Sequence, residues 1–147
     1  MNTHARLSLR GVLCLVLVSA QSCTQGQPWE EYNEAGVEAL DQGRYAEAES
    51  QFIAACKEAE KSGPEDTYLA TSLNNLAGLY RTQGKYTEAE PLFQRSLAIV
   101  EKALGPEHLN VAQNLENYAA LLRKMGRENE AAEMEARAQA IRAKQSP

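Results

Sequence analysis

Side chains that commonly carry catalysis are sparse in this chain of 147 residues. It has two histidines, His4 near the amino terminus and His108 in a Gly-Pro-Glu-His segment. The sequence contains no histidine pair, no cysteine-histidine nucleophile, no metal-ligand cluster and no glycine-rich phosphate loop. Close carboxylates such as Glu47 and Glu49 lie on charged helical segments, where solvation explains them. We therefore expect no catalytic residue, no metal site and no cofactor, and a protein that is not an enzyme.

Cys23 is the one cysteine in a recognisable chemical context. Arg6 and Arg10 precede the apolar run over 11–20 (GVLCLVLVSA). This is the order of an export signal, and the run is too short to cross a bilayer of about 30 Å. The following segment, over 20–23 (AQSC), resembles a bacterial lipobox. That resemblance implies a signal peptide over 1–22, a lipid on Cys23 and a tether over 23–28.

The location of the protein follows from how this leader is processed. Lipidation, with Thr24 rather than an aspartate after Cys23, implies an anchor in the outer membrane and a domain facing the periplasm. Two alternatives stay open. Cleavage before Gln21, after an ordinary signal-peptidase site at 18–20 (VSA), gives a soluble periplasmic or secreted protein. Retention of the leader gives an uncleaved membrane anchor.

The net charge of the chain argues against nucleic acid as a partner. The net charge of -5 becomes -7 once Arg6 and Arg10 leave with the leader. An acidic chain without a basic stripe lacks the electrostatic signature of a nucleic-acid-binding protein.

Cys14 lies in the leader, so a lipidated mature chain retains only Cys56 and has no intramolecular disulfide. In its helical pattern we expect Cys56 to be a buried small hydrophobe rather than a reactive thiol.

An internal repeat defines the elements that must position these residues. The segment over 42–49 (QGRYAEAE) recurs over 83–90 (QGKYTEAE) and, more weakly, over 125–132 (MGRENEAA), at spacings of 41 and 42. Small residues recur at fixed offsets from each turn glycine, namely Gly36, Ala48, Ala55, Ala77, Ala89, Ser96, Ala119, Ala131 and Ala138. They allow antiparallel helices to approach closely. The composition and these offsets predict an all-α chain, with helices over 29–42, 45–62, 66–83, 87–104, 109–125 and 128–144.

These repeats resemble those of the tetratricopeptide repeat family. The residues of the central copy that match its pattern are Leu76, Ala77, Tyr80, Ala89 and Phe93. The segments LNNLAGLY, QGKYTEAEPLFQRSLAI and LGPEH are similar to the kinesin-light-chain variety found in bacteria. The resemblance implies an α-solenoid of three antiparallel helical hairpins over 29–145, with repeats over 29–65, 66–107 and 108–145. Glu135, on the packing face of the last helix, indicates a polar cap that ends the stack.

By the same resemblance, the first helix of each hairpin lines a concave groove that binds a peptide or helix of a partner protein. The residues expected there as ligand contacts are Asn33, Asn74, Asn75, Arg81, Asn117, Arg123 and Lys124. An asparagine amide both donates and accepts, so it pairs with an extended peptide backbone of any sequence. Gly78 and Ala120 leave room for the ligand, and the basic residues form an edge that favours an acidic segment. The implied function is a scaffold or adaptor of the cell envelope.

Other interpretations of the same residues stay open. The asparagines and basic residues are equally compatible with an ordinary solvated helix face. In that case the protein is a structural or regulatory subunit that docks through its edges and has no peptide ligand. A clamp for a terminal carboxylate is not expected, because the matching positions hold Asn33, Val37, Glu116 and Ala120. Three repeats are near the minimum for a stable stack, so a homodimer through an end hairpin is a further possibility.

The lipid anchor gives the first testable prediction. Cells that express the full chain and are fed labelled palmitate are expected to incorporate label, and mass spectrometry should place it on Cys23. A chain without lipid on Cys23 would remove the anchor and leave plain secretion or an uncleaved leader.

Overall fold

Six α-helices make up the described part of the chain, and the computed structural model describes residues 28–145. The helices are α1 (Pro28–Asp41), α2 (Tyr45–Glu60), α3 (Thr67–Thr82), α4 (Tyr86–Leu104), α5 (Leu109–Lys124) and α6 (Glu128–Gln145). The expected all-α fold is confirmed, and every helix end lies within two residues of its predicted position. Cys23 and the predicted signal peptide over 1–22 lie outside the described residues. Of the expected tether over 23–28, only Pro28 is described, and it is the first residue of α1. Proline suits this position because the first amides of a helix have no partner within the helix, so the missing N–H costs no hydrogen bond.

Each pair of helices is joined by a turn that depends on glycine. Gly43, Gly84 and Gly126 have φ angles of 71°, 76° and 75°, in the left-handed region that favours glycine. The amide after each of these glycines donates to a carbonyl five residues back, as in Arg44 N to Ala39 O at 2.8 Å. This hydrogen bond closes the end of the first helix and reverses the chain.

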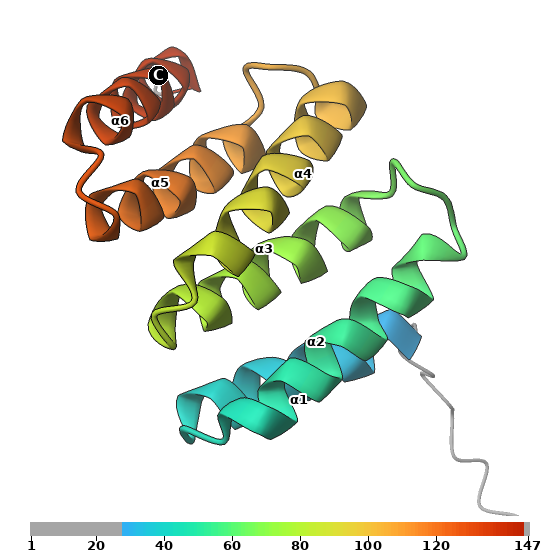
Figure 1. Cartoon of the computed structure of the whole chain (residues 1–147). Helices are drawn as coiled ribbons and strands as arrows, with labels where there is room; N and C mark the ends of the chain where they lie inside the picture. Colours follow the sequence, from blue (N-terminus) through green and yellow to red (C-terminus); the bar gives the residue numbers. More distant parts are fainter. Residues whose placement is uncertain (1–27, 146–147) are drawn as a thin grey trace, which may run out of the picture.

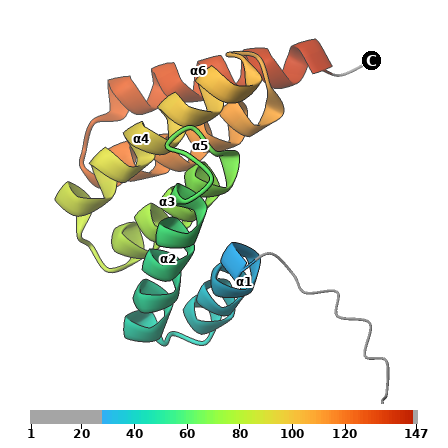
Figure 2. The same cartoon turned by 90° about the vertical axis from the view of Figure 1, so that its right-hand side faces the viewer.

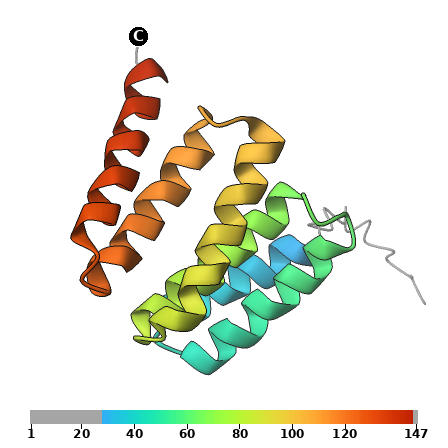
Figure 3. The ribbon, with the colours of Figure 1, turned by 45° about the horizontal axis from the view of Figure 1, so that its top comes forward.

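Three hairpins, α1–α2, α3–α4 and α5–α6, stack in chain order (Figure 1). Neighbouring hairpins contact through α2 with α3 and α4 with α5, and also through α1 with α3 and α3 with α5. Each hairpin is rotated relative to the one before, so the stack is curved (Figures 2 and 3). The inner row of this arc is α1, α3 and α5.

The core lies at the crossing points that the repeat offsets predicted. All nine small residues at these offsets are buried. Larger side chains fill the spaces between the helices, with Phe52 and Phe93 at equivalent places in the first two hairpins and at most 1% exposed. Phe52 packs with Leu76 and Leu79 of the next hairpin, so this cluster joins two repeats. The buried residues form three clusters, and the partly buried Leu92 packs against all three, so it links the hairpins.

Ion pairs recur between successive hairpins at equivalent repeat positions. In each case a glutamate of one repeat pairs with a basic residue of the next. The pairs are Glu49–Lys85 and Glu90–Arg127, Glu60–Arg95 and Glu101–Arg137, and Glu65–Lys102 and Glu107–Lys144. Pairs this exposed contribute about 0–1 kcal/mol each. Their recurrence therefore indicates a role in setting the register of the stack more than in stabilising it.

The last helix carries polar residues where the earlier repeats are apolar. Glu135 occupies the position of Phe52 and Phe93, and its carboxylate forms two hydrogen bonds with the guanidinium of Arg123 on α5, one of them 2.6 Å long. Arg142 occupies the position of Ala59 and Val100, and donates to Glu116 at 2.7 Å and 2.8 Å. Two core positions of the earlier repeats are therefore charged on this face, and it gives a homodimer through this end hairpin no support.

Glycines at two helical positions predict opposite effects of the same substitution. A Cβ at Gly36 would lie 2.5 Å from the Phe52 ring, whereas a Cβ at Gly78 would meet nothing within 4 Å. Gly36→Ala should lower the free energy of unfolding by about 1–3 kcal/mol through overpacking. Gly78→Ala should raise it by about 0.5–1 kcal/mol, because alanine favours a helix interior over glycine. Urea unfolding of both variants measures the difference, and equal effects would contradict the close packing at Gly36.

Candidate functional site

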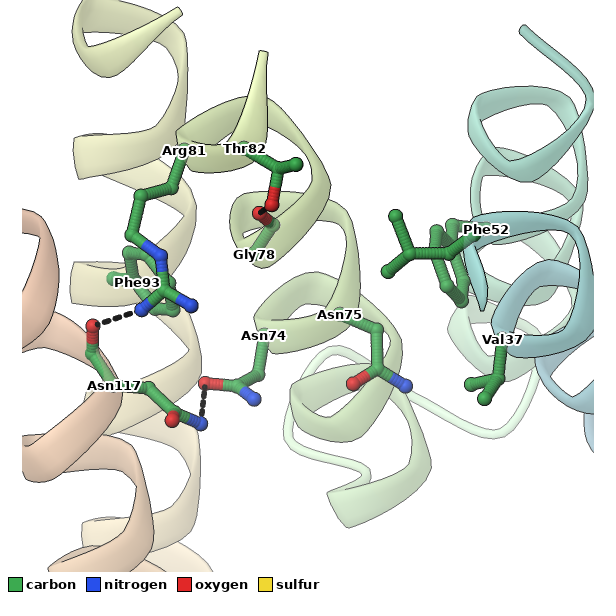
Figure 4. A pocket seen from close by; sticks show the side chains of 10 residues that line it. Val37, Phe52, Asn74, Asn75, Gly78, Arg81, Thr82, Phe93 and Asn117 are labelled. Atoms are coloured by element: carbon green, nitrogen blue, oxygen red, sulfur yellow. Dashed lines mark hydrogen bonds between the residues drawn. The ribbon is translucent and has the colours of Figure 1, made fainter. Parts of the chain in front are cut away.

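A hollow of about 190 Å³ opens on the inner row of helices. It spans all three hairpins (Figure 4). Its lining residues are Val37, Leu40, Phe52, Asn74, Asn75, Gly78, Arg81, Thr82, Phe93 and Asn117. Gly78 contributes no side chain, which leaves space beside α3. The hollow therefore combines apolar walls, three amide side chains and one guanidinium.

Asparagines bridge neighbouring hairpins on this surface. The Nδ2 atom of Asn75 donates to Oδ1 of Asn33 at 2.9 Å, and Nδ2 of Asn117 donates to Oδ1 of Asn74 at 3.2 Å. In both bridges the acceptor lies ten residues, and the donor nine residues, before the turn glycine of its own repeat. The bridge is thus a repeating feature, and these side chains have a structural role in joining the hairpins.

The bridges leave part of each amide available. Asn74 is bonded through its oxygen and Asn75 through its nitrogen. Among the described residues, the Nδ2 atom of Asn74 and the Oδ1 atom of Asn75 have no hydrogen-bond partner. One donor and one acceptor therefore stand next to each other on α3, which is the pair that an extended peptide bond requires.

Arg81 brings a positive charge into the hollow. Its Nη1 atom donates to the backbone oxygen of Asn117 at 3.2 Å, so the side chain reaches from α3 to α5 (Figure 4). None of the residues that line this hollow is a carboxylate. The Asn117 carbonyl that holds the guanidinium is neutral, so no acid that lines the hollow balances the positive charge of Arg81.

Two further hollows continue the first one on either side. One, of about 510 Å³, shares Val37 with it and is otherwise lined by Asn33, Glu34, Glu38, Asp41 and Gln42 of α1. The other, of about 180 Å³, shares Asn74 and is lined by Thr67, Thr71, Val100, Asn110, Gln113 and Asn114. We call the three together the concave groove. Its α1 end is acidic, its middle holds Arg81, and its far end carries only uncharged side chains.

The residues predicted as ligand contacts divide into two groups. Asn74, Asn75, Arg81 and Asn117 line the central hollow, and Asn33 lines the α1 hollow. Arg123 and Lys124 line neither these hollows nor the one at the far end. The guanidinium of Arg123 pairs with Glu135 and Glu128 at the polar end of the stack. Lys124 is exposed at the end of α5.

Two aromatic residues lie in the site that the sequence alone did not assign to it. Phe52 and Phe93 belong to the second helices, α2 and α4, whereas the resemblance placed the groove on the first helices. Both rings are core residues, but each borders the central hollow through the space between two first helices. Their spacing of 41 residues was visible in the sequence as part of the repeat, but only the packed structure shows that they reach the groove.

Groups with catalytic potential have structural roles. The Nδ1 atom of His108 accepts from the amide of Asn110 at 3.1 Å, which makes His108 the amino-terminal cap of α5. Cys56 is buried, as expected from the sequence. Within residues 28–145, no three histidine, cysteine or acidic side chains are grouped so that they could hold a metal ion. In the same range, no helix has the length and apolar character needed to cross a membrane.

Comparisons with known proteins identify relatives of this fold. The tetratricopeptide repeat family model matches residues 31–98 and 68–144. The crystal structure of BtubC (BKLC) from P. vanneervenii is similar, with a TM-score of 0.74 and 22% sequence identity over 80% of this chain. The TPR domain of Arabidopsis FLU has a TM-score of 0.70 and 20% identity, and the match covers 82% of this chain and 98% of that domain. The match spans 47% of BtubC, about half its length. No curated protein matches the sequence significantly.

Because Cys56 is buried, we expect its thiol to react slowly with alkylating reagents. Removal from water, with a smaller contribution from the charge of Glu60 and an opposing one from Arg95, raises the pKa of Cys56 to about 11. A raised pKa keeps the thiol protonated at pH 8, where the native chain should hold about a hundredfold less thiolate than the unfolded chain. Iodoacetamide should therefore modify Cys56 at least that much more slowly in native protein than in guanidinium chloride, as measured by mass spectrometry of its peptide. Equal rates would show that the thiol is reactive in the native state.

Proposed function

The chain belongs to the tetratricopeptide repeat family, and from this premise we propose that it is a non-enzymatic adaptor that holds a segment of a partner protein in its concave groove. The family match extends from residue 31 to residue 144 and confirms the resemblance seen in the sequence. Tetratricopeptide repeats generally mediate protein–protein interactions. The further step, that this chain uses its groove and binds an extended segment, is our proposal.

The observation that supports this step is the adjacent donor and acceptor on α3. Nδ2 of Asn74 and Oδ1 of Asn75 are the free halves of two bridged amides, so their orientation is fixed before a ligand arrives. Fixed groups lose little conformational entropy on binding. An extended segment exposes a carbonyl and an amide at each residue, whereas a helix uses those groups internally. This favours an extended segment over a helical one.

The apolar walls of the groove supply the second part of the interaction. Val37 is 40% exposed, a high fraction for a valine, and lines the central hollow together with Gly78. Leu40 is partly buried beside it. A side chain of the ligand that enters here covers apolar surface, which contributes about 25 cal/mol per Å² removed from water. Amides that bind the backbone and one apolar contact per segment give modest affinity and broad sequence tolerance.

We also propose that the adaptor works in the cell envelope. The support is the leader over 1–22 and the lipobox resemblance at Cys23, which precede the folded domain by a few polar residues. A lipid there would place α1 and the acidic end of the groove close to the membrane surface. Export to the periplasm without a lipid keeps the same function in solution.

Docking through the ends of the stack is the alternative to the groove. The α6 end is polar, since Glu135 and Arg142 replace core residues there and are bonded within their own hairpin. At the α1 end, Glu38, which also lines the α1 hollow of the groove, stands where the next repeat carries the buried Leu79. Polar end faces are typical of repeat arrays that do not extend further. They make the groove the better candidate.

Substitutions in the groove test the proposal. In cells that express the full chain with Asn75→Ala and Asn117→Ala, crosslinking and mass spectrometry should recover fewer partner proteins than with the unchanged chain. Because these changes also remove two bridges between hairpins, Gly78→Leu serves as a second variant. It adds a side chain to the hollow at a position where a Cβ meets nothing within 4 Å, and it leaves both bridges in place.

The control is Lys57→Ala on the exposed side of α2. It should recover the same partners as the unchanged chain. If both groove variants keep every partner while thermal unfolding shows them folded, the groove is not the binding surface and docking through the edges becomes the better interpretation.

A further inference from the structure

Arg81 differs from every other arginine between residues 28 and 145. The others each form an ion pair with a glutamate, namely Arg44, Arg95, Arg123, Arg127, Arg137 and Arg142. Arg81 has no carboxylate partner in the described part of the chain, although acidic residues outnumber basic ones. The one arginine left without an acid is thus the one that lines the central hollow.

The surroundings of Arg81 are suited to a carboxylate from outside. Its guanidinium uses Nη1 for the Asn117 carbonyl and is partly buried. Arginine carries five donors, so the rest of the fork stays available for an acid. Screening by water is weaker in a partly enclosed hollow than on an open surface, so an ion pair there contributes more than the exposed pairs between hairpins.

The groove carries the opposite charge at its α1 end. Glu34, Glu38 and Asp41 line that hollow and form no ion pair among the described residues. Val37 separates them from the central hollow, which it also lines. Negative charge at one end and positive charge in the middle give the groove a direction. A ligand with only acidic residues would be repelled at the α1 end.

The concave groove also continues beyond the central hollow, which Arg81 lines, on both sides. It runs through Val37 to the α1 hollow and through Asn74 to the hollow lined by Thr67 and Asn110. A chain that ended at Arg81 would leave one of these hollows empty, whereas a chain that runs through fills both. The carboxylate is therefore better supplied by an aspartate or glutamate side chain within a segment than by a chain terminus.

We propose that the groove binds an extended segment of a partner protein that places an aspartate or glutamate side chain on Arg81 and a lysine or arginine side chain on the acidic α1 hollow. The inference rests on the proposed function, since it specifies the ligand of the same groove. The carboxylate of the segment accepts from the guanidinium of Arg81 while the backbone pairs with Asn74 and Asn75. The basic side chain sets which way the segment runs.

A positional peptide array tests this. The purified full chain is applied to immobilised nine-residue peptides of mixed sequence, capped at both ends, in which each position in turn is fixed as one amino acid. The expected result is an enrichment of aspartate and glutamate at one position and of lysine and arginine on one side of it only. Capped peptides carry no terminal charge. A groove that requires a terminal carboxylate would bind none of them, and that result would contradict an internal acid as the ligand of Arg81.

Charge variants locate the preference. Arg81→Gln should abolish the acidic preference and lower binding of the selected peptides about tenfold or more, and Arg81→Glu should replace it with a basic preference. Arg123→Gln, which removes an arginine outside the groove, should leave the preference unchanged. Glu34→Gln with Glu38→Gln should weaken the basic preference alone. Circular dichroism and thermal unfolding establish that each variant is folded.

The outcomes separate this inference from the proposed function. Peptide binding without an acidic preference, or a preference that survives Arg81→Gln, overturns the inference and leaves groove binding intact. Enrichment of basic residues on both sides of the acid overturns the proposed direction. Absence of binding to the capped peptides, with binding to the same peptides when their carboxyl ends are free, overturns the inference and leaves groove binding intact. Absence of binding to both sets overturns both proposals.

Discussion

Close approach of the two helices within each hairpin is the constraint on which the rest of the structure depends. In the first hairpin, the Phe52 ring occupies the space that a side chain at residue 36 would need, so only glycine fits there. Alanine takes the same place in the other two hairpins and is fully buried. The three hairpins stack because each presents the same geometry to the next, and the concave groove is the inner surface that this stacking produces. The first helices of neighbouring hairpins can therefore form the concave groove only when small residues occupy the crossing points.

Periodicity made the fold accessible from the sequence, because helix ends, turn glycines and buried small residues all recur at fixed offsets. Contacts between hairpins were harder to predict. Asn33 bonds with Asn75, a residue 42 positions away, and the offset within the repeat changes from ten to nine. That change depends on the rotation of one hairpin relative to the next, which sequence spacing does not contain. The pairing of Arg123 with Glu135 lies within the third hairpin and depends on how α5 and α6 face each other, and it engages a charge that the resemblance assigned to the groove.

Charge is arranged differently on the two sides of the arc. On the outside, glutamates and basic residues pair from one repeat to the next, so they neutralise each other and keep the hairpins in register. On the inside, Arg81 and the acids of α1 form no ion pair among the described residues. The acids of α1 are exposed, whereas Arg81 is partly buried, so an acid that a ligand brings to Arg81 is screened less by water than one on an open surface. Paired charges outside and unpaired charges inside distinguish the surface that maintains the stack from the surface proposed to bind.

The asparagine bridges give the groove a mechanical property. Each bridge joins two hairpins through a single hydrogen bond on the inner row of helices. A ligand that forms hydrogen bonds with the free halves of these amides polarises the same groups that hold the hairpins together. Ligand occupancy of the concave groove and curvature of the stack would then change together. The bridges share the joints between hairpins with apolar clusters and ion pairs, so filling the groove would change the pitch of the stack only as far as those contacts allow.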